Sequence, residues 1–282
     1  MLKRLLGPTN RRIRICVGLM LVGLFCIQCI GPSSGKFSTK AVAGGGQSNM
    51  ATPELRKLAQ SDHVALLEYC LRNCQKYTDY RCTFIKQELI RGKVGEEQQV
   101  KVKFRREPFS VAMAWQKNPP RGDRVLYVEG KYGNQMLVRP SGAIARALAP
   151  TVLRDPNGPD ARRTTLRTVN MFGFERGLEN LLKVYKQAKQ RGDLREKLLE
   201  DAEVKGRNTF VLARYLPEGR GYPAYKTLIY IDQEYLVPIM IEGLDSNGQY
   251  ICQYVYTDIE FNPGLTDKDF LPENNDLVTP KQ

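Results

Sequence analysis

The chain of 282 residues is 42% hydrophobic and 26% charged, which is ordinary for a globular protein and excludes wholesale disorder, a collagen-like chain and a polytopic membrane protein. Its single histidine, His63, excludes a multi-histidine metal site and leaves one residue for any Ser-His or Cys-His catalytic pair. Residues 1–43 contribute seven of the positive charges and no negative one, so the rest of the chain carries only +6 of the net +13. This distribution does not predict nucleic-acid binding, which needs a concentrated basic surface.

The N-terminal 35 residues have the order of an export signal. Basic residues up to Arg14 are followed by sixteen uncharged residues, Ile15–Ile30, and then by a small, polar stretch. The apolar run is longer than many signal peptides need and shorter than the roughly 20 residues that span a bilayer. Residues 1–35 are therefore predicted to be a cleaved signal peptide or a retained membrane anchor, and residues 36–51 a flexible linker.

Lipidation of Cys26 or Cys29 is an alternative fate for this segment. It is disfavoured because Phe25 and Gln28, which precede these cysteines, are bulkier than a lipidation signal prefers. In each case the basic flank stays in the cytoplasm, so we expect the body in the periplasm or at the outer face of the cytoplasmic membrane.

The body begins with a predicted helix. Thr52, Pro53 and Glu54 provide an N-cap, a proline in the first turn and an acidic residue that favours a helix N-terminus. Apolar residues then recur at helical spacing, which predicts that the helix continues to Asp79 with one buried face. They are Val64, Leu67, Leu71, Cys74 and Tyr77.

From Tyr80 the apolar pattern has a period of two, which predicts strands. Tyr80, Cys82 and Phe84 share one face of the first strand. Further hairpins are predicted up to residue 139 and again over residues 205–261, separated by a long loop at 150–164 and a helix over 174–190. Short turns between consecutive strands predict an antiparallel meander that curls around the two helices.

Several stretches of the body carry a family resemblance. Residues 80–88, 102–105, 108–111, Trp115 and 125–128 resemble a bacterial domain-of-unknown-function family found mostly in planctomycetes. The later stretches 230–232 and 258–262, together with Pro238 and Phe270, are similar to envelope lipoprotein carriers of the LolA and LppX type.

The resemblance implies an α+β fold in one domain, residues 52–275, followed by a short C-terminal tail, residues 276–282. In such a fold a strongly curved, unclosed antiparallel β-barrel has helices over its concave face, where acyl chains are held. The fold alone does not settle the function.

Five apolar residues are the candidate lining of this concave face: Phe84, Met113, Trp115, Leu228 and Tyr230. If the helices leave the face open, these residues border a lipid-sized pocket; if the helices fill it, the barrel has no ligand. A shift of strand parity by one residue would exchange the inner and outer faces.

The cysteines beyond the export segment are Cys70, Cys74, Cys82 and Cys252. In an oxidising compartment they could form two disulfides, and their spacing does not choose among three pairings. A Cys70–Cys74 bridge across one helical turn would be strained, and buried free thiols are the alternative. The four cysteines lack the close ligand pairs of a zinc site, so no metal is expected.

No catalytic residue is predicted. We expect His63 on the surface and interpret Asp258 and Glu260, which could mimic a glycosidase pair, as solvated charges. The sequence thus predicts a non-catalytic envelope protein that binds a lipid, an acyl chain or a lipoprotein and uses no cofactor. It could contact the membrane through its N-terminus. A scaffolding protein with a filled barrel is the alternative, and an enzyme is the third hypothesis.

Overall fold

The computed structural model describes residues 52–279, so the predicted export segment and linker lie outside the described residues. These residues belong to a compact unit, Asn49–Gln282, which contains both hydrophobic clusters of the structure. We therefore expect residues 49–282 to fold on their own. Within residues 52–279, no helix is long and apolar enough to cross a bilayer.

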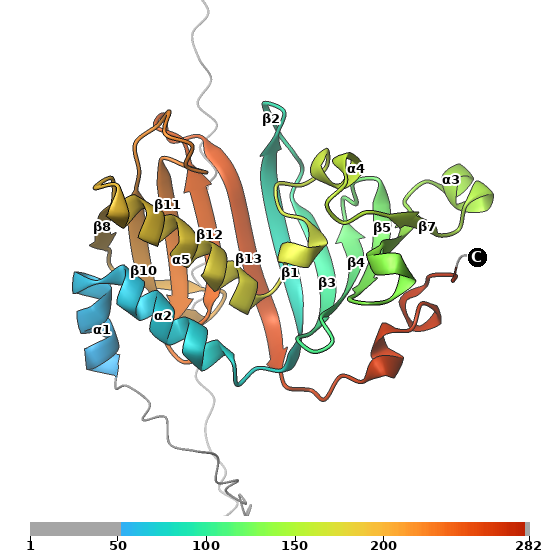
Figure 1. Ribbon diagram of the computed structural model, residues 1–282, viewed down its shortest axis with the longest axis horizontal. Helices are drawn as coiled ribbons and strands as arrows, with labels where there is room; N and C mark the ends of the chain where they lie inside the picture. The colour runs from blue at the N-terminus through green and yellow to red at the C-terminus, as the bar shows by residue number, and fades with distance from the viewer. Residues whose placement is uncertain (1–51, 280–282) are drawn as a thin grey trace, which may run out of the picture. The chain divides into compact units, whose positions relative to one another are not determined.

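The described residues form one antiparallel sheet of thirteen strands (Figure 1). The first strands in the chain are β1 (Asp79–Ile90), β2 (Lys93–Val94), β3 (Gln98–Arg105), β4 (Ser110–Lys117), β5 (Gly122–Val128), β6 (Met136–Pro140) and β7 (Val152–Arg154). The later ones are β8 (Arg195–Leu198), β9 (Ala202–Val204), β10 (Arg207–Tyr215), β11 (Lys226–Asp232), β12 (Pro238–Leu244) and β13 (Tyr250–Phe261).

The order of the main strands is β7-β6-β5-β4-β3-β1-β13-β12-β11-β10-β8. The first long strand, β1, and the last, β13, are therefore neighbours in the middle of the sheet (Figure 1). The edge strands β7 and β8 do not pair, so the sheet stays unclosed. This confirms the predicted α+β class with a large unclosed antiparallel sheet. The predicted meander is present as two meanders joined by the β1–β13 pairing.

The helices are α1 (Thr52–Ser61), α2 (His63–Cys74), α3 (Ala143–Leu148), α4 (Pro159–Arg162) and α5 (Phe174–Gln190). The prediction of one N-terminal helix is wrong, because the helix breaks at Asp62. The Asp62 side chain accepts a hydrogen bond of 3.0 Å from the backbone N–H of Ala65 and so caps α2. The predicted loop contains β7 and α4, whereas α5 has the predicted bounds.

Helices α2 and α5 lie over the β10–β13 half of the concave face (Figure 1). The apolar stripe of α5, which includes Leu178 and Leu182, is buried in the main hydrophobic cluster. On the strand side, Tyr80, Cys82 and Phe84 are buried in the same cluster, as their alternation predicts. The main core of the protein thus lies between these helices and the sheet.

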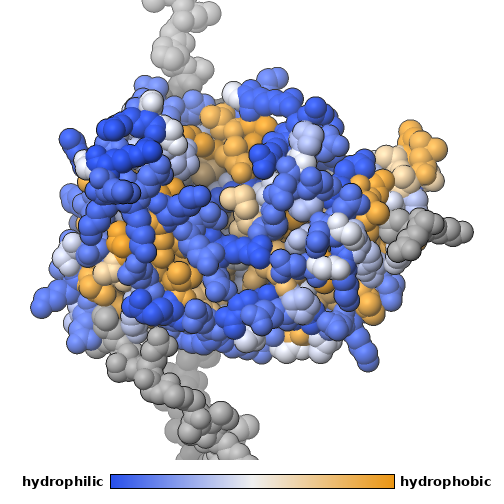
Figure 2. Space-filling model, in the orientation of Figure 1, coloured by the Kyte–Doolittle hydropathy of each residue, from blue (hydrophilic) through white to orange (hydrophobic). Residues whose placement is uncertain are grey.

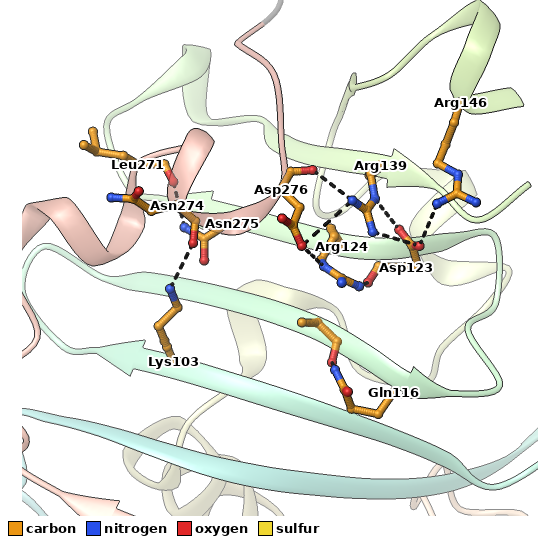
Figure 3. Close-up of polar contacts among 11 residues, drawn as sticks. Lys103, Gln116, Asp123, Arg124, Arg139, Arg146, Leu271, Asn274, Asn275 and Asp276 are labelled. Atoms are coloured by element: carbon orange, nitrogen blue, oxygen red, sulfur yellow. Dashed lines mark hydrogen bonds and ion pairs between the residues drawn. The ribbon is translucent and has the colours of Figure 1, made fainter. Parts of the chain in front are cut away.

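The opposite face of β4–β6 is covered by the C-terminal segment 263–279, which includes the short turns η3 (Asp267–Phe270) and η4 (Glu273–Asn275). Leu277 is buried there against the sheet, and the Asp276 carboxylate accepts a hydrogen bond of 3.1 Å from Arg124 Nε (Figure 3). The predicted boundary at residue 275 therefore cuts through a packed segment rather than marking the start of a tail.

Candidate functional site

A cavity of about 320 Å³ opens on the concave face beside the N-terminal end of α5. Its walls come from the sheet, from the start of α5 and from the segment 155–173, which contains α4 and η2 (Val169–Met171). Most of the lining is apolar, and its aromatic members are Phe84, Trp115, Phe172, Phe174, Tyr254 and Tyr256. Figure 2 shows apolar surface in a hollow between polar side chains on this face. The volume is at the lower end of the range of small-molecule sites.

The cavity brings together three of the five residues that the sequence predicts as lining. Phe84 on β1 and Met113 and Trp115 on β4 all border it. The Trp115 indole N–H also donates a hydrogen bond of 2.9 Å to Gln98 Oε1, which fixes the orientation of the ring. Strand parity was therefore read correctly in this half of the sheet.

Leu228 and Tyr230 on β11 are not among the lining residues, and their placement on the concave face is a parity error. Between them, Ile229 is fully buried and pairs with Ile241 of β12, which does border the cavity. Since neighbouring side chains alternate between faces, Leu228 and Tyr230 lie on the opposite face. There the Tyr230 hydroxyl donates to Glu242 Oε2 at 2.9 Å.

Two charged residues that sequence reasoning did not assign to the site, Lys86 and Glu88, are buried in the cavity wall. Lys86 Nζ lies 3.0 Å from Glu88 Oε2. The period of two places both on the same face of β1 as Phe84, and this was the signal that could have found them. A buried charge is stable only when it is paired and hydrogen-bonded, so this pair needs further partners.

Those partners come from two other elements. The Tyr254 hydroxyl of β13 donates to Glu88 Oε1 at 2.7 Å, and the same oxygen accepts from Thr165 Oγ1 at 3.1 Å and from the Leu166 N–H at 3.2 Å. Burial raises the pKa of Tyr254, and the nearby Glu88 carboxylate raises it further, so the Tyr254 hydroxyl stays protonated. The network therefore fastens the segment 155–173 to the centre of the sheet at the cavity wall.

The charged groups that border the cavity are predominantly basic. Lys86, Arg121, Arg154 and Arg167 border it, against two carboxylates, Glu88 and Asp160. Both carboxylates already have basic partners, since Glu88 pairs with Lys86 and Asp160 lies 3.8 Å from Arg154. Among residues 52–279, neither Arg121 nor Arg167 forms an ion pair, and the Arg167 guanidinium lies 4.9 Å from the centre of the Tyr254 ring.

All four cysteines of the described residues are free thiols, which is the alternative to the disulfides. Cys70, Cys74 and Cys82 are buried, and burial raises the pKa of Cys70 and of Cys74 to about 12. Burial likewise raises the pKa of Cys252. Thiols with such raised pKa values are poor nucleophiles and poor metal ligands at neutral pH.

His63 is buried, and the expectation of a surface position is wrong. The break at Asp62 turns the first residue of α2 towards α5, where His63 Nδ1 lies 3.2 Å from the Tyr185 hydroxyl. His63 does not border the cavity. Asp258 and Glu260 have side chains that are 68% and 60% exposed, as expected for solvated charges. Within residues 52–279, no cluster of His, Cys, Asp and Glu could hold a metal ion.

A family model matches residues 77–278, a range that includes all the strands just described. The chain belongs to the family described as Protein of unknown function (DUF1571). The matched range includes residues 80–88, 102–105, 108–111 and 125–128, the stretches on which the resemblance to a family of unknown function was based. No curated protein matches this DUF1571 chain.

Solved structures with similar folds are remote from this DUF1571 protein. A crystal structure of MucB shares 14% identity over 75% of this chain and 63% of that chain, at a TM-score of 0.46. The MucA/MucB complex of Pseudomonas aeruginosa shares 13% identity over 75% of this chain and 61% of that chain, at a TM-score of 0.45. The lipoprotein LppX of Mycobacterium tuberculosis matches at 14% identity, 77% and 99% coverage and a TM-score of 0.43. This chain spans about three fifths of the MucB chains. Likenesses at this level assign no function to the DUF1571 chain.

Proposed function

We propose that this protein is a non-catalytic envelope protein that binds a lipid or another acyl chain in the cavity. The observation that carries the proposal is the apolar hollow left on the concave face of the sheet. Folded proteins rarely keep voids of this size in their cores, so an apolar cavity that opens to the surface favours an apolar ligand. In this proposal the side chains of Phe84, Met113 and Trp115 contact the acyl chain of the ligand.

The basic groups of the cavity indicate which end of the ligand binds where. A guanidinium binds carboxylate and phosphate groups in a bidentate manner, and Arg121 and Arg167 have no carboxylate partner among the described residues. We therefore assign them to an anionic head group, with the acyl chain among the aromatic residues. The buried pair of Lys86 and Glu88 is internally neutral and serves to hold the cavity wall.

The proposed location is outside the cytoplasmic membrane, and it rests on the order of basic, apolar and small residues at the N-terminus. A fusion of residues 1–51 to alkaline phosphatase tests it, because this enzyme is active only after export. We expect an active fusion, and loss of activity when Leu21 and Leu24 are both replaced by Arg. An inactive wild-type fusion would contradict export.

Ligand binding can be tested at Gly177, which borders the cavity from α5. A Cβ atom added there meets no neighbouring atom within 4 Å, so we expect a larger side chain at this position to extend into the cavity. We expect residues 49–282 to bind the fluorescent fatty acid cis-parinaric acid. Gly177→Leu should weaken this binding at least tenfold, whereas Gly177→Ala, the matched control, should change it little.

Native mass spectrometry of residues 49–282, isolated gently from cells, supplies an independent measurement. A mass increment that organic solvent extracts as a lipid supports the proposal. A clean unliganded mass, together with no binding of cis-parinaric acid, would favour the filled barrel and contradict it.

A further inference from the structure

Helix α3 exposes an apolar surface close to the cavity. Ile144 and Leu148 are 80% and 84% exposed, and they lie four residues apart, so their side chains share one face of the helix. Figure 2 shows this apolar protrusion at the right-hand edge of the molecule, over α3. Large apolar side chains exposed in this way are costly in water, so a partner that covers them is expected.

The opposite side of α3 is tied to the sheet. Arg146 Nη1 lies 3.7 Å from Asp123 Oδ2, and Asp123 also accepts two hydrogen bonds, of 2.8 and 3.1 Å, from Arg139 (Figure 3). Because Arg146 follows Ile144 by two residues, its side chain points away from the apolar face. The tether to Asp123 therefore holds Ile144 and Leu148 outward, towards solvent.

The surroundings of this apolar face are basic. The segment 139–167, which carries α3, β7 and α4, contains six arginines and two aspartates. Among the described residues, the exposed Arg162 of α4 forms no ion pair. The same segment borders the cavity through Pro140, Val152 and Arg154. The apolar face of α3 therefore belongs to a segment with an excess of basic residues that also borders the proposed ligand site.

We propose that α3 docks the protein onto a lipid bilayer that contains anionic lipids, with Ile144 and Leu148 inserted among the head groups. A second copy of the chain does not fit as well, because two protruding side chains cannot supply the roughly 800 Å² per partner of a stable interface. Insertion of a few apolar side chains together with attraction between arginines and anionic lipids is sufficient for reversible membrane binding. The docking surface goes beyond the proposed function. It would hold the cavity close to the bilayer from which a lipid ligand could be taken.

The experiment uses residues 49–282 and sedimentation with vesicles of 30% phosphatidylglycerol in phosphatidylcholine. We expect the protein to bind these vesicles and to bind pure phosphatidylcholine more weakly. Replacing both Ile144 and Leu148 by Ser should weaken binding at least tenfold, and Arg162→Gln about fivefold. The matched control is Val94→Ser, since Val94 is 49% exposed in the β1–β2 hairpin and should leave binding unchanged.

Binding of cis-parinaric acid in solution separates this inference from the proposed function. The Ile144 and Leu148 variant should keep wild-type affinity for the fatty acid, because neither residue borders the cavity. Vesicle binding without fatty-acid binding would support the docking surface and contradict the cavity ligand. Wild-type vesicle binding by the double variant, or a dimer that this variant dissociates in the absence of vesicles, would overturn the inference.

Discussion

The two halves of the concave face differ in what covers them. Over β10–β13 lie α2 and α5, whose apolar stripes are buried against the strands. Over β3–β6 lies the segment 155–173, whose polar residues and short turns border the cavity. A helix with a continuous apolar stripe fills a curved sheet, whereas an irregular polar segment bridges it and leaves space below.

The largest effect that tests this contrast is the cost of removing a side chain from each half. Leu178→Ala, in the filled half, should lower the free energy of unfolding by about 3 kcal/mol or more, because Leu178 is fully buried. Met113→Ala, at the cavity, should cost about 1 kcal/mol or less, since its side chain already borders empty space. Urea denaturation measures both, and equal losses would show that the two halves are packed alike.

The second effect is a pH dependence that arises from a buried histidine in the filled half. Burial lowers the pKa of His63 from 6.5 to about 4, so the unfolded chain takes up a proton in this range before the folded one does. The contribution of the neutral His63 to the free energy of unfolding is therefore complete above pH 6.5. It decreases by up to about 3 kcal/mol as the pH falls towards 4.

The groups that face His63 are Asp62 beside it, Tyr185 of α5 and Glu196 of β8. Burial raises the pKa of Glu196, which favours the folded state on acidification and opposes the effect of His63. The difference between wild type and His63→Gln, measured by urea denaturation from pH 4 to 7, isolates the histidine. A variant that loses stability with acid as steeply as wild type would refute the assignment.

The smallest effect is a gain in stability at the cavity. Gly177 lies inside α5, and an alanine there meets no neighbouring atom. Gly177→Ala should raise the free energy of unfolding by about 0.5–1 kcal/mol, because glycine loses more backbone freedom in a helix. Thermal unfolding would show a small increase in Tm. A decrease would mean that the cavity beside this residue is smaller than described.

The sequence predicted those elements whose apolar pattern has one clear period. The stripe of Leu178, Leu181, Leu182 and Tyr185 predicted α5 with its correct bounds. The strand β11 instead has four consecutive apolar residues, 228–231, so its alternation could not decide between the faces, and Leu228 and Tyr230 were placed on the wrong one.

Other features depend on contacts between distant parts of the chain. The buried position of His63 depends on how α2 meets α5, about 120 residues later in the chain, as the pair His63 and Tyr185 shows. Lys86 and Glu88 are stable on an apolar face only because Thr165 and Tyr254 hydrogen-bond to them. The period of two places both residues on the face of Phe84, but no local pattern reports their partners, so the hydrogen-bond network of the site could not be predicted.

The pairing of β1 with β13 has a consequence for synthesis of the chain. On the ribosome, β1, which begins at Asp79, emerges about 170 residues before its neighbour β13, which begins at Tyr250. Until that neighbour appears, one edge of β1 is unpaired and able to bind other extended chains. Every fragment that ends before residue 250 therefore lacks the strand that joins the two meanders, and nascent chains depend on protection until translation is almost complete.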